Sequence, residues 1–141
     1  MIIAIASDHG GYQAKKEIIQ HIKQSGLCSW MDFGTRNEHS CDYPDFAQAV
    51  CADVAEGRAD LGILICGTGI GMSMAANRNP AIRAGLCKDA ETAQLSRQHN
   101  NANVLCLGAR VTGMSDILNI VNEFVRTEFE GGRHQKRIDK I

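Results

Sequence analysis

Short apolar runs alternate with amphipathic helical segments five times along this 141-residue chain. Runs this short and this apolar are typical of strands buried on both faces, as in a parallel sheet. The expected strands are residues 2–6, 27–33, 61–66, 82–86 and 103–107. The alternation predicts an α/β fold, with a doubly wound five-stranded parallel sheet in a Rossmann-like three-layer sandwich. By analogy with flavodoxin-like folds, we expect the strand order 2-1-3-4-5.

Capping and breaking residues set the bounds of the expected helices. In chain order these are a helix over 12–25 stopped by Gly26, one opened by Asp42-Tyr43-Pro44 and ended by Gly57, one through Asn77, one from Asp89 to about Gln98, and one capped by Ser115. Pro44 suits the first helical position, where its missing N–H costs nothing.

The composition gives no bias toward nucleic acid or membranes. The chain is 44% hydrophobic and 22% charged, with a formal net charge of −1. No apolar run approaches the roughly 18–20 residues of a membrane span. The apolar run at the N-terminus, of about six residues, is too short for a signal peptide, so we expect none. The six cysteines include no Cys-x-x-Cys pair, which excludes a zinc ribbon and a thioredoxin-type motif. We expect one domain over residues 1–141, with reduced thiols, in the cytoplasm.

A thiol and three glycines follow the third expected strand. Cys66 ends the strand, and Gly67, Gly69 and Gly71 occupy alternate positions after it. Glycine lets backbone N–H groups approach a ligand closely, and a helix N-terminus follows, so this place suits negative charge. The same setting favours the thiolate form of a cysteine. Cys66 is therefore either catalytic or inert packing, the common fate of a buried cysteine, and the other cysteines are interpreted as structural.

Nucleotide-binding motifs fit this loop poorly. A dinucleotide fingerprint would need glycine at position 72, where Met72 stands, and would follow the first strand rather than the third. Asp89, about twenty residues further on, keeps that alternative open. A Walker phosphate loop is excluded because no Gly-Lys-Ser/Thr sequence follows.

Asp8 and His9 follow the first strand, so they should share the carboxyl edge of the sheet with Cys66. They either cap the turn or bind a hydroxylated substrate. Arg133 and Arg137 are four residues apart, so on a helix they would share a face and could clamp a phosphate. The alternative for these arginines is a solvated charged tail.

His99 and Asn100 are expected between the fourth helix and the fifth strand, at the amino edge of the sheet. Cys66 lies at the other edge, a strand length of about 17–20 Å away. His99 is therefore either a surface residue or part of a neighbouring subunit's site. Arg110 follows the fifth strand, at the correct edge for its own site or for an interface.

Five motifs carry a family resemblance. They are Ser7-Asp8-His9-Gly10-Gly11, Asp42-Tyr43-Pro44, Cys66-Gly67-Thr68-Gly69-Ile70-Gly71, Ala93-Gln94-Leu95-Ser96-Arg97-Gln98-His99-Asn100 and Glu130-Gly131-Gly132-Arg133-His134. In this order they resemble the type B ribose-5-phosphate isomerases, which are related to the galactose-6-phosphate isomerase subunits and to allose-6-phosphate isomerase. The resemblance runs from Ile2 to about Arg137.

The resemblance implies interconversion of ribose 5-phosphate and ribulose 5-phosphate in the pentose phosphate pathway. The reaction would pass through a cis-enediolate without metal or organic cofactor. Cys66 matches the family's base, and His99 matches the acid/base that opens the sugar ring across a dimer interface. The implied substrate-binding residues are Asp8, His9, Tyr43, Gly67, Thr68, Gly69, Ile70, Gly71, Asn100, Arg110, Arg133 and Arg137. Residues 130–141 would form a C-terminal arm carrying the last two arginines.

Some relatives place a glutamate base shortly after the glycine loop, where this chain has Met74 and Ala75, so the cysteine version of the mechanism is favoured. The implied partners are a sugar phosphate and a second copy of the chain, in a homodimer with shared active sites. Pairing of dimers into a tetramer stays open, and neither nucleic acid nor membrane is expected. One alternative is the same chemistry on allose 6-phosphate or galactose 6-phosphate. Another is a non-catalytic nucleotide or sugar-phosphate binding module, which the presence of Cys66 and His99 disfavours.

Overall fold

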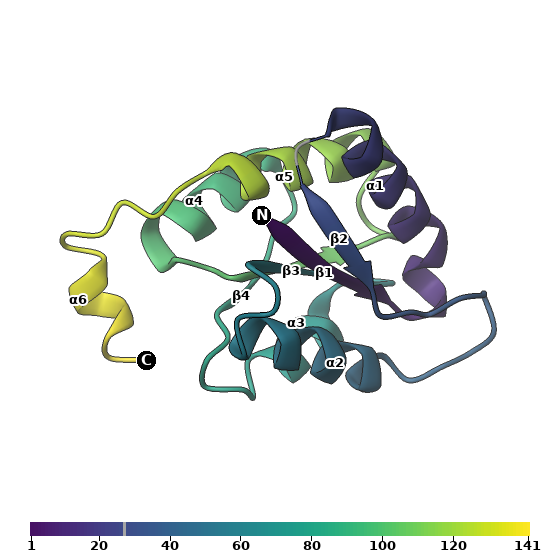
Figure 1. Cartoon of the computed structure of the whole chain (residues 1–141), viewed down its shortest axis with the longest axis horizontal. Coiled ribbons are helices and arrows are strands. Elements are labelled where there is room, and N and C mark those ends of the chain that lie inside the picture. Colours follow the sequence, from purple (N-terminus) through teal and green to yellow (C-terminus); the bar gives the residue numbers. More distant parts are fainter. Residues whose placement is uncertain (27) are drawn as a thin grey trace.

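A parallel sheet runs through the middle of the molecule between two layers of helices (Figure 1). The structure, a computed structural model, describes residues 1–26 and 28–141. The strands are β1 (Ile2–Ser7), β2 (Ser29–Asp32), β3 (Leu61–Cys66), β4 (Ala84–Leu86) and β5 (Val104–Gly108). The helices are η1 (His9–Gly11), α1 (Tyr12–Ser25), α2 (Tyr43–Ala55), α3 (Ile70–Ala76), α4 (Ala90–Asn100), α5 (Met114–Arg126) and α6 (Gln135–Ile138). The predicted fold class is confirmed.

The order of the strands is β2-β1-β3-β5-β4, so the expected order 2-1-3-4-5 is wrong at one edge. Every residue of β5 is buried, whereas β4 has three residues and leaves Leu86 44% exposed. The longer apolar strand therefore takes the interior place and the short one takes the edge. Because β5 pairs with β3, from Gly62↔Val104 to Cys66↔Gly108, the loops after these two strands lie side by side.

The two faces of the sheet carry separate halves of the core. Alternate β1 residues point to opposite faces, so Ile3 and Ile5 pack under α1 and α5 while Ala4 and Ala6 pack under α2 and α3. Helices α1, α4 and α5 cover one face and α2 and α3 cover the other (Figure 1). Small residues let α2 approach closely, since a β-carbon on Gly62 would lie 2.8 Å from Val50 Cγ1.

Most expected helix bounds are found. Gly26, with φ of 63°, ends α1, and Asp89 caps α4 in a capping box with Thr92. Helix α2 begins at Tyr43, so Pro44 is not its first residue. Gly113 is the N-cap of α5, one residue before Met114, so the expected cap at Ser115 is wrong.

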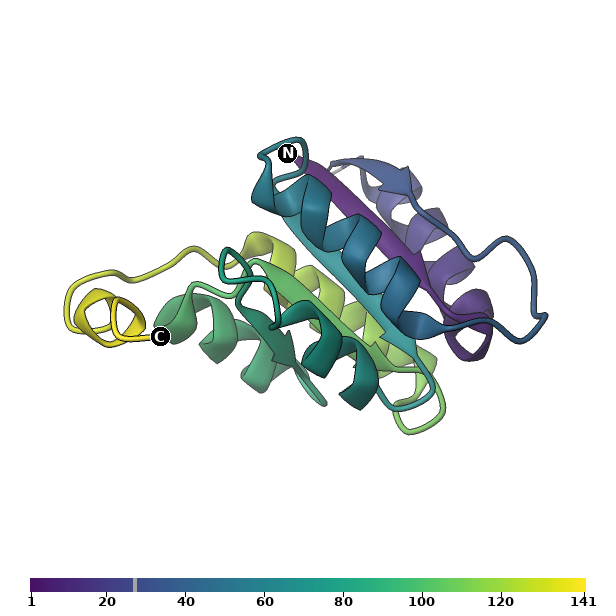
Figure 2. The same cartoon turned by 90° about the horizontal axis from the view of Figure 1, so that it is seen from below.

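Three boundaries bear on the site. Helix α4 runs through Asn100, two residues past the expected end, so His99 and Asn100 are helical. Strand β2 is shorter than residues 27–33, and Leu27 lies outside the described residues. After α5, the chain extends past the end of α4 to α6, which stands apart from the two helix layers (Figure 2). Within residues 1–26 and 28–141, no helix combines the length and apolar character that a bilayer crossing requires.

Candidate active site

The loop after β3 holds Cys66 at the carboxyl end of the sheet. Cys66 is 5% exposed, and the N–H of Gly69 donates to its Sγ at 3.1 Å. Gly69 reaches this position with φ of 78°, a conformation that glycine adopts without strain. A β-carbon there would lie 2.5 Å from Leu86 Cδ1. A backbone N–H directed at sulfur stabilises negative charge on it.

Hydrogen bonds inside the loop reduce the number of backbone N–H groups that are free to bind the negative charge expected there from the sequence. The Gly69 N–H is directed at Cys66, and the Ile70 N–H donates to Thr68 Oγ1 at 3.3 Å. These two groups are already engaged within the loop. The donors that remain for a bound anion are the other three N–H groups of residues 67–71.

Two side chains flank the glycine loop. The Tyr43 ring at the start of α2 packs on Gly71, where a β-carbon would lie 2.6 Å from Cζ. The N–H of Arg110 donates to the carbonyl of Gly67 at 2.9 Å. Its side chain lies over Gly67 and Gly10, where added β-carbons would sit 3.2 Å from Cδ and 3.4 Å from Nη2. Arg110 therefore belongs to the Cys66 loop of its own chain.

Asp8 and His9 follow β1 at the same edge. Asp8 Oδ1 accepts the N–H groups of Gly10 at 2.8 Å and Gly11 at 3.2 Å, so this carboxylate caps η1. The N–H of Cys41 donates to His9 Nδ1 at 3.3 Å. A neutral His9 therefore carries its proton on Nε2, where it is available as a donor.

A buried lysine supports the turn that carries Asp8. Lys15 is 1% exposed, forms an ion pair with Asp32 and donates to the carbonyl of Thr35 at 2.9 Å. The Thr35 N–H in turn donates to the carbonyl of Ser7 at 2.7 Å, one residue before Asp8. No sequence motif marks Lys15, so sequence reasoning missed it.

His99 lies at the opposite end of the sheet from Cys66. It is in the last turn of α4, close to where β5 begins, whereas Cys66 pairs with Gly108 at the end of β5. Val104 and Gly108 are four residue steps apart along the strand, which corresponds to about 13 Å. The location of His99 and Cys66 at opposite edges of the sheet, expected from the sequence, is therefore found, although β5 is shorter than the expected strand length of about 17–20 Å.

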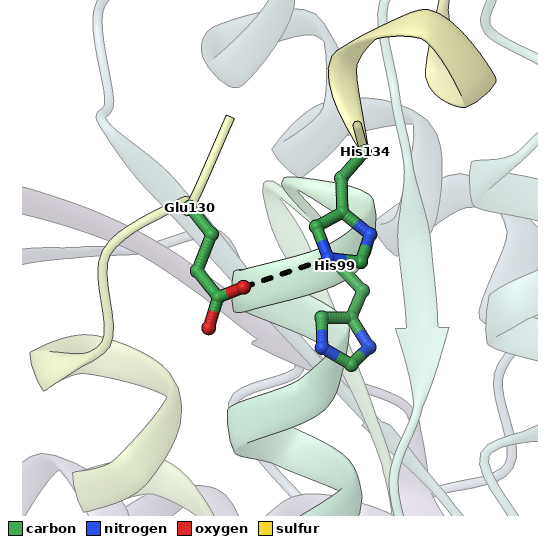
Figure 3. Close-up of side chains that lie close together, drawn as sticks. All are labelled: His99, Glu130 and His134. Carbon is green, nitrogen blue, oxygen red and sulfur yellow. Dashed lines mark ion pairs between the residues drawn. The ribbon is translucent and has the colours of Figure 1, made fainter. Parts of the chain in front are cut away.

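Figure 3 shows how His99 meets the segment after α5. Its ring stacks on His134, with centroids 4.2 Å apart and an interplanar angle of 10°. His134 Nε2 lies 3.5 Å from Glu130 Oε2 and 3.3 Å from Arg133 Nε. Burial lowers the pKa of His134, and the nearby His99 and Arg133 lower it further. His134 is therefore neutral near pH 7, and its Nε2 accepts the N–H of Arg133.

The same side chains form a poor metal site. The ligand atoms of His99, Glu130 and His134 lie within 4.8 Å of one another. Zinc needs imidazole lone pairs that converge on a point about 2.0–2.1 Å from each nitrogen. Stacked rings direct their in-plane lone pairs alongside one another, and the Arg133 guanidinium already occupies His134 Nε2. Sequence reasoning did not foresee this cluster, although the four-residue spacing of Glu130 and His134 was visible.

The C-terminal arm, residues 130–141, carries a basic hollow. This open hollow of about 900 Å³ is lined by Gly132, Arg133, Lys136, Arg137, Asp139 and Lys140. Arg133 precedes α6, so the helical face expected to hold both arginines is not formed. Both arginines nevertheless line the same hollow, whose charge favours an anion.

The predicted site residues thus form two groups. The Cys66 group, at the carboxyl ends of the strands, is Asp8, His9, Tyr43, Cys66, Gly67, Thr68, Gly69, Ile70, Gly71 and Arg110. The His99 group, at the end of α4 and on the arm, is His99, Asn100, Arg133 and Arg137. Neither group contains both the thiol and the imidazole that the sequence motifs predict to act together.

Comparison with known proteins supports the motif resemblance. The model of a family described as Ribose/Galactose Isomerase matches residues 3–141. A putative sugar phosphate isomerase of Rickettsia conorii is 48% identical over 139 residues, which cover 99% of this chain and 96% of the relative. The structure of Clostridium thermocellum ribose-5-phosphate isomerase B has a TM-score of 0.97 and 49% identity, covering 99% of this chain and 94% of the other.

A further solved structure is that of ribose-5-phosphate isomerase B from Mycoplasma genitalium with bound ribulose-5-phosphate. It has a TM-score of 0.94 and 48% identity, and the match covers 99% of this chain and 92% of that one. The order and identity of the five motifs, the sheet and these full-length matches agree. The chain therefore belongs to the ribose/galactose isomerase family.

Proposed function

We propose that this chain is an aldose–ketose isomerase that interconverts ribose 5-phosphate and ribulose 5-phosphate in the pentose phosphate pathway. The observation that carries the proposal is the Gly69 N–H directed at Cys66 Sγ at the carboxyl end of β3. A thiolate that accepts a backbone N–H in this way could act as the base that removes a proton from carbon. The relative from M. genitalium, with ribulose-5-phosphate bound, points to the same substrate.

Cys66 removes the proton from C2 of the open-chain aldose and returns it to C1, and the hydroxyl proton of O2 passes to O1. Proton transfer to or from a reacting carbon by a positioned side chain is general acid–base catalysis. The negative charge of the cis-enediolate develops on oxygen, where the remaining N–H groups of residues 67–71 act as donors. Losing one such donor typically costs about 3–4 kcal/mol of barrier.

Asp8, His9 and Tyr43 bind the sugar. His9 is oriented for this role, because the Cys41 N–H on Nδ1 leaves the proton on Nε2. Tyr43 limits the pocket where its ring packs on Gly71. The Lys15 contacts behind Ser7 keep the Asp8 turn in place.

The complete site is shared between two copies of the chain. His99 opens the ring and Asn100 holds a hydroxyl, both supplied to the Cys66 group of the partner. The separation of about 13 Å along β5 supports this arrangement. Exposed apolar side chains beside the glycine loop, Ile70 at 48% and Met74 at 66%, provide a surface for the partner to cover.

The phosphate is bound by arginines from both sides. Arg110 extends over Gly67 in the Cys66 group, and Arg133 and Arg137 line the basic hollow of the partner's arm. Guanidinium groups suit this role because their donor forks match phosphate oxygens. The whole chain acts as one domain, with the arm reaching the neighbouring site.

The enzyme works in the cytoplasm without metal or organic cofactor. All six cysteines, each in the described part of the chain, are free thiols, which supports a reducing compartment. The proton transfers that the proposal assigns to Cys66 and His99 require no electron carrier.

A coupled assay comparing ribose 5-phosphate, allose 6-phosphate and galactose 6-phosphate tests this function. We expect the highest kcat/KM for ribose 5-phosphate, unchanged after exhaustive dialysis against a chelator. A higher kcat/KM for a six-carbon substrate would replace the pentose assignment by the alternative within the same family. Turnover of none of the three would contradict the proposed isomerase.

A further inference from the structure

The His99 group is assembled from two segments that are distant in the sequence. His99 and Asn100 come from α4, whereas Arg133 and Arg137 follow α5. In the proposed function, which this inference takes as its starting point, one segment holds the sugar ring and the other holds its phosphate. The distance between the two segments therefore has to match the length of the substrate.

Arg97 joins these segments. Its Nε donates to the carbonyl of Thr127, just after α5, at 3.1 Å. Its Nη1 donates to the carbonyl of Ala102 at 2.5 Å and to Asn101 Oδ1 at 3.4 Å, at the end of α4. The guanidinium carbon lies 5.5 Å from the centre of the Phe124 ring. Arg97 thus bridges the end of α4, which carries His99, to the base of the segment that leads to the arm.

Two further contacts continue the connection toward the phosphate side. The Glu130 N–H donates to the carbonyl of Gln98 at 3.1 Å, and His134 stacks on His99. Both contacts follow Thr127 in the chain, so Arg97 holds the residue from which this part of the arm extends. Lysine could not replace this bridge, because a single ammonium lacks the rigid fork that reaches two carbonyls at once.

The candidate substrates differ by one carbon between the reacting end and the phosphate. One added C–C bond is about 1.5 Å. A displacement of about 1 Å at a reacting centre can cost on the order of a hundredfold in rate. A scaffold that fixes the spacing of His99 and Arg133 to within 1 Å would therefore discriminate five-carbon from six-carbon sugar phosphates.

We propose that Arg97 is a positioning residue that sets the length of the sugar phosphate the site accepts, by fixing the α4 end against the base of the arm. It contacts no substrate itself. When it is removed, the arm should shift relative to His99, and selectivity between chain lengths should fall more than overall folding does.

Arg97→Met and Arg97→Lys test this role, with Arg126→Met as the matched control. Arg126 is exposed, and its side chain forms no hydrogen bond or ion pair with any residue that the structure describes. Two readouts are taken: kcat/KM for ribose 5-phosphate and allose 6-phosphate, and calorimetric Kd for ribitol 5-phosphate and allitol 6-phosphate. These open-chain polyol phosphates cannot isomerise, so binding is read independently of turnover. Thermal unfolding confirms that each variant is folded. If Arg97→Met does not fold, the Arg97→Lys variant alone is used for the comparison.

We expect both Arg97 variants to lower the five-carbon to six-carbon ratio at least tenfold in binding or turnover, with Arg126→Met unchanged. An equal loss for both lengths, or no loss, would overturn the inference. If the wild type binds the polyol phosphates without turning over either sugar, the proposed function fails, and the Kd ratios alone decide the role of Arg97. Binding of neither polyol phosphate by the wild type would overturn both.

Discussion

The backbone N–H of Gly69 and the sulfur of Cys66 are hydrogen-bonded at 3.1 Å. One backbone N–H donor of the loop is therefore bonded to the proposed base and is not available to a bound substrate. Negative charge on sulfur and negative charge on the enediolate would be stabilised by neighbouring N–H groups of one loop. Under the proposed function, the reactivity of the site would rest on a short stretch of backbone as much as on side chains.

Replacing Cys66 by serine should lower kcat about 10²–10⁴-fold, because a hydroxyl in the same place is a far weaker acid than a thiol and yields almost no anionic base. The Kd for ribulose 5-phosphate should stay nearly constant, since the binding residues are untouched. Coupled kinetics and calorimetry measure the two quantities. Cys28→Ser, at a half-buried cysteine outside the Cys66 group, is the control. A Cys66→Ser variant with near wild-type kcat would show that the base lies elsewhere.

His99→Ala should separate ring opening from proton transfer. Ribulose 5-phosphate cannot close a five-membered ring, because its C5 hydroxyl carries the phosphate. The variant should therefore still exchange the C1 hydrogen of ribulose 5-phosphate with D2O through Cys66, as followed by NMR. Its kcat/KM for ribose 5-phosphate should fall about 10²–10⁴-fold. Loss of exchange in parallel with isomerisation would argue against a role limited to the ring.

Mixtures of Cys66→Ala and His99→Ala chains should recover activity. In a two-fold symmetric dimer with shared sites, each hybrid has one intact site and one doubly defective site. After full exchange of an equimolar mixture, about a quarter of wild-type activity should appear. Mass spectrometry of labelled chains confirms that hybrids formed. Hybrids without activity would mean that the two residues do not serve one site.

Acid should weaken the contacts of the arm through His134. The pKa of His134 in the folded protein lies below the ordinary 6.5, mainly because the side chain is buried. His99, Arg133 and Arg137 lower this pKa further, whereas Glu130 raises it. The unfolded chain therefore takes up the proton first as pH falls below about 6.5, and stability is lost in that range. Protonation also removes the acceptor for Arg133.

Between pH 7 and pH 5 the wild-type Tm should consequently fall further than that of His134→Gln, which keeps an acceptor without titrating. The exposed His39→Gln variant should behave like the wild type. Equal slopes for wild type and His134→Gln would mean that His134 does not contribute to this pH dependence.

Truncating Asp32 should lower the free energy of unfolding more than truncating Lys15 does. Lys15 is 1% exposed, whereas the Asp32 side chain is 38% exposed. Asp32→Ala leaves a buried ammonium without its partner, which should cost roughly 3–5 kcal/mol. Lys15→Met leaves a carboxylate that water can reach and one unpaired carbonyl, at roughly 1–3 kcal/mol. Urea unfolding of both variants, with the exposed Asp139→Ala as control, checks the order. A larger loss for Lys15→Met would contradict it.

Local features of the fold were predictable, and long-range ones were not. Gly26 and Asp89 act within their own turns, so sequence alone identifies them as helix ends. The order of β4 and β5 depends on which run is buried on both faces, a competition between distant segments that periodicity does not record. That order matters to the site, because a strand between β3 and β5 would move Arg110 away from Gly67.

The same distinction between local and long-range features applies to the residues of the candidate site. Cys66 and Asp8 were predictable together because carboxyl ends of parallel strands converge where the strand order reverses. The stacking of His134 on His99 and the support of Lys15 behind Ser7 come from contacts across the fold, and no spacing in the sequence reports them. Arg97 lay inside a recognised motif, but its partner Thr127 lies 30 residues away.

Strand β5 begins near His99 and ends beside Cys66, so the length of this strand keeps the two residues of one chain apart. Under the proposed shared site, they never act on the same sugar molecule. Selection on the fit between the two residues then operates between molecules rather than within one. A change at the carboxyl edge of one chain would then alter its fit to the amino edge of the partner, which the same gene encodes.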